Sequence, residues 1–367
     1  MSSTQHQDVV PNTDPPLRVF HVGGRGGMGP VECLLQLGES LSLSIFEANI
    51  ESEDSSWNDY DNLIADYANR YGIKLSVIQQ CLSNCVGKKE FHINVMPDCS
   101  SLLKMSPDAK NYARMDRGKY RIIWGQICQP TRTIEISVTT LDELYANGVI
   151  QMPHFLSLDV QGAEYDILEG ASKVLQGDLL GVVSEVEFRQ LYEGQKLFVN
   201  QYILLRKHQF SLFELYNPEY WYSGPIVGNG ALMVAEALFL RDFQYFLRKN
   251  KEPASLLSNL SKLAVVAYCF DRRSYAFEIV EYIMNNWQHE WNIFIKQSNS
   301  RYLHDLTEFY REVKELQPQM EGVPTYSEFM AKGANDLPRH KSVQRLKSAL
   351  RLAYNLNLKM ILDKLRR

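Results

Sequence analysis

Short apolar runs of strand character alternate with helix-period segments over the first two thirds of the chain, and this alternation limits the fold most strongly. The runs at 17–22 and 41–47 flank a helical segment that has Pro30 in its first turn and Gly38 at its end. Strands joined through helices form right-handed crossovers, so the pattern predicts an α/β fold with a mostly parallel sheet. Further strands are expected at 73–80, 154–160, 179–188, 210–216 and 231–240.

The sequence pattern changes near residue 240, where strand-like runs are replaced by apolar residues spaced with helical periodicity. The segments at 260–270 and 274–287 are typical of a single helical hairpin. A chain of 367 residues is also long for one compact core. We therefore predict a disordered tail over 1–16, an α/β domain over 17–240 and an all-helical domain over 241–367.

Composition and charge exclude several classes of protein. The net charge of −4 argues against a general nucleic-acid binder, which would carry a strongly basic surface. No secretory signal is visible, and no apolar run approaches the roughly 18 to 20 residues of a transmembrane segment. The cysteines are too few and scattered for a disulfide scaffold, and the CxxxC at Cys81 and Cys85 lacks a second ligand pair at zinc-finger spacing. Reduced thiols in a cytoplasmic protein fit this pattern best.

Five glycines lie within seven positions directly after the first expected strand. Gly24, Gly26 and Gly29 satisfy GxGxxG, the dinucleotide fingerprint, whereas a GxxxG turn from Gly23 to Gly27 is typical of a S-adenosylmethionine loop. Both ligands carry a ribose, and both require an acid at the end of the second strand. Glu47 stands 20 residues after Gly27, so it supports a nucleoside site without distinguishing the two. A tight packing turn is the third interpretation.

The segments 156–171 and 182–198 resemble the FkbM family of S-adenosylmethionine-dependent methyltransferases, a resemblance that extends over about 17–240. "FEAN" is similar to the family's F-E-P stretch, "CSSLL" to its serine pair, and "VTTLDEL" to its T-L-D-E-L run. The family pattern hydrophobic-D-V-x-G-x-E-x-x-x-L-x-G-A is met at Asp159, Val160, Gly162, Glu164, Leu168, Gly170 and Ala171.

The resemblance implies a Rossmann-like class I methyltransferase sheet of seven strands, one of them antiparallel, with S-adenosyl-L-methionine at the carboxyl ends of its first half. Gly23, Gly24 and Gly27 would approach the methionyl part of this cofactor. Glu47 would bind the ribose, because a carboxylate accepts two O–H bonds from a vicinal diol.

The same resemblance assigns three further residues to the cofactor. Gln80 and Cys81, at the end of the third strand, would border the adenine. His21 stands where the family usually has an acid at the end of the first strand. It is expected either to hold a water or backbone group of the cofactor network or to be a hydrogen-bonded core histidine.

Two acids late in neighbouring parallel strands, Asp159 and Glu185, are the predicted catalytic bases, because open α/β sheets bind ligands there. Structural alternatives are a helix cap for Asp159, and ion pairs of Glu185 or Glu187 with Arg189 or Arg206. The three acids together offer oxygen ligands for a divalent metal, but nothing in their spacing requires one, and a metal is not favoured.

Aromatic residues cluster after the fifth strand and around the sixth, and they predict either a stacking surface for the acceptor or a packing cluster. Tyr192 and Trp221, together with Glu187, are the predicted substrate-binding residues. The long polar segment 96–120 is predicted to be a lid that closes over the acceptor.

The predicted function is methylation of a hydroxyl on a glycan, glycolipid or secondary metabolite. The alternatives are methylation of a peptide amide nitrogen, a catalytically silent nucleoside-binding module, and an NAD-linked oxidoreductase suggested by the GxGxxG pattern. Expected partners are therefore a small-molecule, glycan or peptide acceptor, and no nucleic acid. The basic, amphipathic stretch 339–367 adds a homodimer or a membrane-surface contact through the helical C-terminal part as further alternatives.

Overall fold

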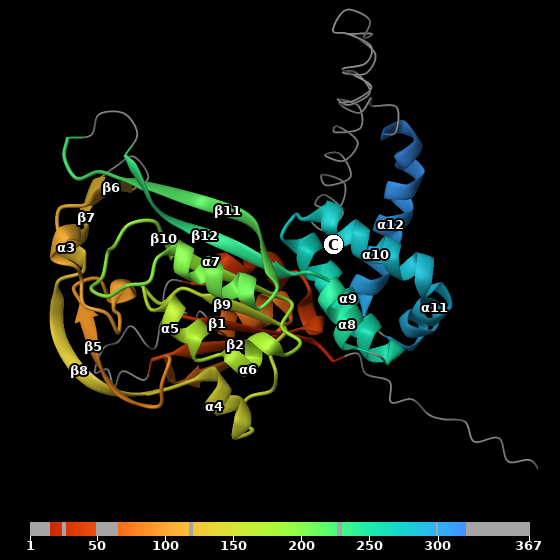
Figure 1. The fold of residues 1–367 in the computed structure, drawn as a ribbon, viewed down its shortest axis with the longest axis horizontal. Coiled ribbons are helices and arrows are strands. Elements are labelled where there is room, and N and C mark those ends of the chain that lie inside the picture. Colours follow the sequence, from red (N-terminus) through yellow and green to blue (C-terminus); the bar gives the residue numbers. More distant parts are fainter. Residues whose placement is uncertain are drawn as a thin grey trace, which may run out of the picture. The chain divides into compact units, whose positions relative to one another are not determined.

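A computed structural model describes most of the chain (Figure 1). The predicted tail, apart from residues 15 and 16, and the basic stretch 339–367 lie outside the described residues. The chain divides into two compact units, Met1–Tyr302 and Leu303–Arg367. The described residues are 15–23, 27–48, 65–116, 120–225, 230–250, 252–298 and 300–320.

A seven-stranded sheet forms the centre of the first unit, with the strand order β11-β12-β10-β9-β1-β2-β3. Within this sheet β12 runs antiparallel to both of its neighbours, and the other pairings are parallel. The predicted mostly parallel sheet with one antiparallel strand is thereby confirmed. The strands are β1 (Leu17–Val22), β2 (Leu41–Glu47), β3 (Lys74–Gln79), β9 (Phe155–Leu158), β10 (Gly181–Glu187), β11 (Phe210–Trp221) and β12 (Ala231–Arg241).

The central strands are buried on both faces, which explains their nearly continuous apolar sequences. One face packs Phe20, Phe46 and Leu156 against short helices on the same side of the sheet. On the other face, the Phe155 ring stacks on Phe270 at 5.2 Å. The helices that follow the strands are α1 (Glu32–Leu35), α4 (Leu141–Ala146), α5 (Glu164–Glu169), α6 (Ser172–Gln176) and α7 (Phe198–Lys207), and residues 65–71 are also helical.

Two smaller sheets follow β3 in the chain. One has the order β4-β8-β5, formed by β4 (Cys81–Leu82), β5 (Gly87–Asn94) and β8 (Pro130–Thr139). The other is the hairpin β6 (Ala113–Asp116) and β7 (Tyr120–Ile123), which leads into α3 (Trp124–Ile127). Backbone hydrogen bonds tie the predicted lid to the rest of the unit, from Ser106 N to Leu191 O and between Ala113 and Tyr222. The lid function stays a prediction.

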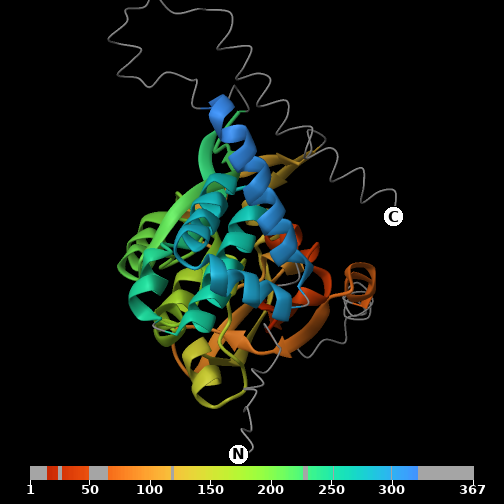
Figure 2. The same ribbon diagram turned by 90° about the vertical axis from the view of Figure 1, so that its right-hand side faces the viewer.

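The helices after β12 are α8 (Gln244–Lys249), α9 (Pro253–Cys269), α10 (Arg273–Asn286), α11 (Gln288–Gln297) and α12 (Arg301–Met320), and α9 with α10 forms the predicted hairpin. Figure 2 shows α8–α11 gathered on one side of the sheet. The buried Arg241 at the end of β12 donates hydrogen bonds to the carbonyl oxygens of Leu179 and Leu175, and its own carbonyl accepts one from Tyr275 Oη. These bonds hold the hairpin and the sheet in one compact unit, and the domain boundary near 240 stays a prediction. Over the residues described, no helix has the length and apolarity needed to cross a membrane.

Candidate active site

A cavity of about 260 Å³ opens where the parallel strands β1, β2, β9 and β10 end, beneath the segment 96–102. It brings together predicted residues from six separate segments of the sequence. Gly24 lies outside the described residues, and His21 and Gly27 are not among the lining residues. The predicted residues that line the cavity are Gly23, Glu47, Gln80, Cys81, Asp159, Glu185, Glu187, Tyr192 and Trp221.

Gly23 lies between the ends of two neighbouring strands and has no room for a side chain. Its φ is +92°, and a Cβ built on it would lie 1.6 Å from the carbonyl oxygen of Asp159. Its backbone N–H donates to Phe46 O at 3.1 Å, and Asp159 N donates to Val22 O at 3.0 Å. The bare backbone is therefore required by the approach of β1 to β9 at the rim of the cavity.

The other described glycines of the loop separate the two motif interpretations. Gly27 also has φ +92°, whereas Gly29 has open space around a built Cβ and no left-handed backbone. The described backbone thus requires glycine at both ends of the GxxxG turn. It does not require glycine at the last position of the dinucleotide fingerprint.

His21 is fully buried and is hydrogen-bonded to the end of the glycine loop. Its Nε2 lies 2.9 Å from the Gly27 carbonyl oxygen, and its Nδ1 lies 2.9 Å from Ser157 Oγ. Because a carbonyl oxygen only accepts, Nε2 carries the proton and Nδ1 accepts from the Ser157 hydroxyl. Burial lowers the pKa of His21 to about 4, so the ring is neutral near pH 7.

His21 should make stability pH-dependent. The unfolded chain takes up a proton at this residue below pH 6.5 and the folded chain only near pH 4, so its contribution is complete above pH 6.5 and is lost as the pH falls through that window. We expect the stability advantage of wild type over His21→Gln to shrink by about 2 to 3 kcal/mol between pH 7 and pH 4.5. Urea unfolding of both proteins at each pH measures this difference, and contributions of the buried acids cancel in the comparison. Parallel stability curves would contradict the assignment.

One end of the cavity has the side chains that a nucleoside needs. Glu47 is 7% exposed and ends β2 directly beside Gly23. Gln80 follows β3, and Cys81 begins β4, with Phe91 and Leu102 adding apolar surface. Burial and the nearby Glu47 raise the pKa of Cys81 to about 12, so this residue is an unreactive thiol that serves as an apolar wall.

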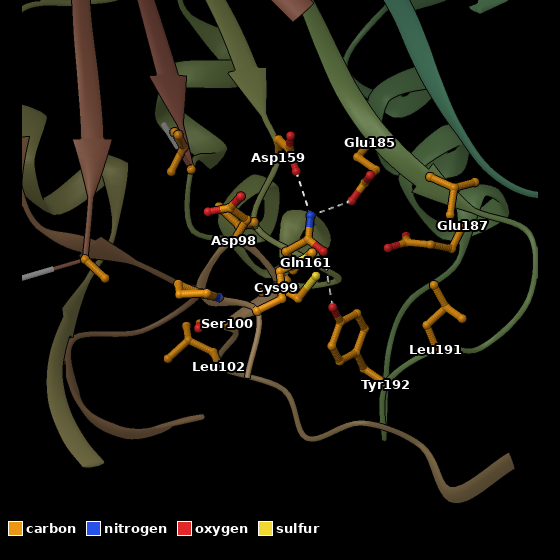
Figure 3. A pocket seen from close by; sticks show the side chains of 18 of the residues that line it. Asp98, Cys99, Ser100, Leu102, Asp159, Gln161, Glu185, Glu187, Leu191 and Tyr192 are labelled. Atoms are coloured by element: carbon orange, nitrogen blue, oxygen red, sulfur yellow. Dashed lines mark hydrogen bonds between the residues drawn. The ribbon is translucent and has the colours of Figure 1, made fainter. Parts of the chain in front are cut away.

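A single amide joins the two predicted bases, as Figure 3 shows. Gln161 Nε2 donates to Asp159 Oδ1 at 2.9 Å and to Glu185 Oε2 at 3.3 Å. The Tyr192 hydroxyl donates to Gln161 Oε1 at 3.4 Å, and Ser101 Oγ donates to Gln161 O at 2.8 Å. Gln161 thus joins Asp159, Glu185, Tyr192 and the segment 96–102 in one hydrogen-bond network.

Burial changes the acidity of this network. It raises the pKa of Asp159 to about 6, while the Gln161 hydrogen bond acts in the opposite direction. The pKa of Glu185 is raised well above its ordinary value by burial and by Asp159, and that of Glu187 by burial and by Glu164. Asp159 is therefore the acid of this set that most readily gives up its proton near pH 7.

Both structural alternatives for the acids are wrong. Arg206 Nη1 donates to Phe210 O and Ser211 Oγ, and in the described part of the chain no ion pair joins Arg189 or Arg206 to Glu185 or Glu187.

Asp159 does not cap the following helix either. The Val160 and Gly162 N–H groups of that turn both donate to Glu164 Oε1, at 2.8 and 3.1 Å. The Asp159 carboxylate is left to face Gln161 and the cavity.

The opposite end of the cavity is aromatic. Trp124 packs against Trp221 with ring centroids 4.9 Å apart and meets Tyr192 edge-on at 5.9 Å. Trp221 and Tyr192 are buried and also line the cavity, so the aromatic cluster packs the core and forms the wall at once. Here Arg114 pairs with Glu219 at 2.7 Å.

Sequence reasoning missed Gln161, Trp124, Arg114 and Glu219, although all four line the cavity. Gln161 occupies the variable position of the D-V-x-G-x-E pattern, and its φ of +59°, unusual for a residue other than glycine, is visible only in the folded backbone. Trp124 lies between residues 88 and 135, where short strand-like runs mix with polar stretches and the sequence predicts no clear element. Among the residues that the structure describes, no group of three or more His, Cys, Asp or Glu side chains is placed to hold a metal ion.

Comparison with known proteins relates part of the chain to one family. Residues 43–212 match the family described as the methyltransferase FkbM domain. The chain is also similar to the crystal structure of a methyltransferase FkbM from Methylobacillus flagellatus KT, with 12% identity and a TM-score of 0.33, over 61% of this chain and 44% of that one. The match thus spans less than half of that protein, and no curated protein matches the chain. We conclude that residues 43–212, a little under half of the chain, match the methyltransferase FkbM domain.

Proposed function

We propose that this protein is an S-adenosylmethionine-dependent methyltransferase that methylates a hydroxyl group. The observation that carries the proposal is one cavity that holds the buried Glu47 beside Gly23 and, in the same space, the bridged acids Asp159 and Glu185. Support comes from the family match and from the strand order, in which β12 is the one antiparallel strand of the described sheet, as in the class I methyltransferase fold.

The residues at the nucleoside end fit the cofactor. The carboxylate of Glu47 would accept hydrogen bonds from the ribose diol, and Gly23 would let the methionyl part approach the backbone. Gln80 offers an amide to the adenine edge, and the apolar wall of Cys81 and Phe91 suits its flat face. His21 would act indirectly, through the carbonyl oxygen of Gly27.

The bound cofactor supplies an activated methyl group. The chain's own residues would orient the acceptor and take up its proton. The proton of the acceptor O–H would pass to the Asp159 carboxylate, the oxygen's electron pair would form the new bond to the methyl carbon, and the methyl–sulfur electron pair would stay on sulfur, which leaves S-adenosylhomocysteine. Gln161 keeps Asp159 and Glu185 in fixed positions, which limits the motion needed to reach the reacting geometry. A pKa of about 6 leaves Asp159 mostly ionised at pH 7, as a base requires.

Replacement of Glu47 tests the cofactor assignment. We expect Glu47→Ala to weaken the binding of S-adenosylhomocysteine by about 2 to 4 kcal/mol, because two charge-assisted hydrogen bonds are lost. Isothermal titration of the folded variant measures this, with Glu90→Ala, an exposed glutamate on β5, as the matched control. Titration with NAD tests the rival cofactor on the same protein. Unchanged affinity for S-adenosylhomocysteine in Glu47→Ala would reject the assignment.

A further inference from the structure

The aromatic end of the cavity contains two buried polar atoms that have no partner in the protein. Trp124 Nε1 is a donor and Glu187 Oε2 belongs to a carboxyl group, and both residues line the cavity. Trp124 is 6% exposed and Glu187 is 1% exposed. A buried polar atom without a hydrogen bond is unfavourable, so both atoms are positions where a ligand would be bound through polar contacts.

The other polar side chains of the aromatic wall are already engaged. Trp221 Nε1 donates to Glu219 Oε2 at 2.8 Å, and Glu219 Oε1 accepts from Arg114 at 2.7 Å. The Tyr192 hydroxyl donates to Gln161. Gln195 acts on the Glu187 carboxyl group through a side-chain hydrogen bond, but Glu187 Oε2 and Trp124 Nε1 remain without a hydrogen-bond partner that a ligand at this end could supply.

The chemistry of these two atoms favours a hydroxyl-bearing ligand. Trp124 Nε1 requires an oxygen that accepts a hydrogen bond. Burial and the nearby Glu164 raise the pKa of Glu187 well above its ordinary value, so its carboxyl group takes up a proton more readily than an exposed glutamate, and in its protonated form it also donates a hydrogen bond. A hydroxyl both accepts and donates, so a single hydroxyl group can satisfy Glu187 in either protonation state.

The charges that line the cavity oppose an anionic ligand. Its described lining contains six acids and a single cationic side chain, Arg114, which is already paired with Glu219. A carboxylate or phosphate on the ligand would meet acids in a site of low polarity and no unpaired cation. The flat rings of Trp124 and Trp221 instead suit the C–H face of a ring. The acids are Glu47, Asp98, Asp159, Glu185, Glu187 and Glu219.

We propose that the space bounded by Trp124, Trp221 and Glu187 is an acceptor subsite for an uncharged ring that carries several hydroxyl groups, as a neutral sugar does. This inference rests on the proposed function for its link to methyl transfer, but the binding itself does not depend on it. It narrows the acceptor to neutral polyhydroxylated compounds and disfavours sugar acids.

The experiment measures the binding of matched sugars to the intact protein by saturation-transfer NMR titration. The probes are the methyl glycosides of glucose, galactose and mannose, and the corresponding methyl glycosides of the three uronic acids, which replace one CH₂OH by a carboxylate. We expect the neutral glycosides to bind and the uronates to bind at least about tenfold more weakly. All titrations are run with and without S-adenosylhomocysteine.

Two variants test the residues. Trp124→Phe removes the indole N–H and keeps an aromatic ring, and Glu187→Leu removes the carboxyl group at similar volume. Glu187→Leu deletes an unsatisfied buried atom and should unfold at the same or a higher temperature. Trp124→Phe also leaves a smaller ring in the aromatic cluster, so its unfolding temperature should be equal or somewhat lower. Affinity for the neutral glycosides should nevertheless fall about fivefold or more, while Trp287→Phe, outside the cavity lining, should leave it unchanged.

The results that would contradict the acceptor subsite differ from the result that would contradict the proposed function. If no neutral glycoside binds in either state, if the uronates bind equally well, or if both variants keep wild-type affinity, the acceptor subsite is wrong. If the neutral glycosides bind selectively but S-adenosylhomocysteine does not bind, the result supports the acceptor subsite and contradicts the proposed methyltransferase function.

Discussion

Replacement of Asp159 by asparagine is expected to lower turnover about 10²-fold or more, with affinity for S-adenosylhomocysteine nearly unchanged. Asparagine keeps the size of the side chain and its hydrogen bond from Gln161, but it cannot take the acceptor's proton. Turnover is measured as the formation of S-adenosylhomocysteine with a neutral glycoside that binds. Because the pKa of Asp159 is about 6, kcat/KM of wild type should rise with pH through that value, and the variant should lack this rise.

Glu185→Gln provides the comparison within the same acid pair. Burial and the neighbouring Asp159 raise the pKa of Glu185 well above its ordinary value, which makes it the weaker candidate for the base, so a smaller loss of turnover than that of Asp159→Asn is expected. Near-native turnover and an unchanged pH profile in Asp159→Asn would exclude this residue as the base. A lower melting temperature with normal turnover of the surviving folded protein would make its role structural.

Replacement of Gly23 by alanine is expected to destabilise the protein by roughly 2 to 6 kcal/mol, the sum of backbone strain and overpacking. A side chain at φ +92° is strained, and its Cβ would overlap the carbonyl oxygen of Asp159, which cannot move without disturbing β9. Urea unfolding measures the loss. The surviving folded protein should also bind S-adenosylhomocysteine more weakly, because Gly23 and Asp159 both line the cavity.

Gly29→Ala is the matched control in the same loop. A Cβ at this position meets nothing within 4 Å, so alanine should leave stability within about 0.5 kcal/mol of wild type. Equal losses of stability in the two variants would show that the loop as a whole, and not the contact with Asp159, requires glycine.

The regular part of the fold could be predicted because its signals are local. The expected bounds of β1 and β2 agree with the structure, since apolar runs between turn residues identify buried strands. The expected strand at 154–160 was too long, and β9 is Phe155–Leu158. His154 and Asp159 lie directly before and after this strand. The His154 ring accepts a hydrogen bond from the Arg18 backbone N–H, and Asp159 lines the cavity.

The cavity could be predicted in part, from residues at the ends of parallel strands. Glu47, Asp159 and Glu185 follow the rule that ligands bind at those ends, and all three line the cavity. Trp124, Arg114 and Glu219 follow no such rule, because α3, β6 and β11 reach the cavity through tertiary packing. Arg114 and Glu219, for example, lie 105 residues apart in the sequence, and no local pattern encodes such a pairing.

The sequence by itself determined the strand and helix alternation, the glycine loop and the acids at the strand ends, because these depend on backbone conformation and on the period of apolar residues. Tertiary structure alone decided which groups share one cavity and how burial changes them. The bridge of Gln161 between Asp159 and Glu185, the neutral His21 beneath the loop and the unsatisfied Trp124 N–H all arise where distant segments meet. Hydrogen-bond geometry and desolvation act through space, so these properties appear only once the chain has folded.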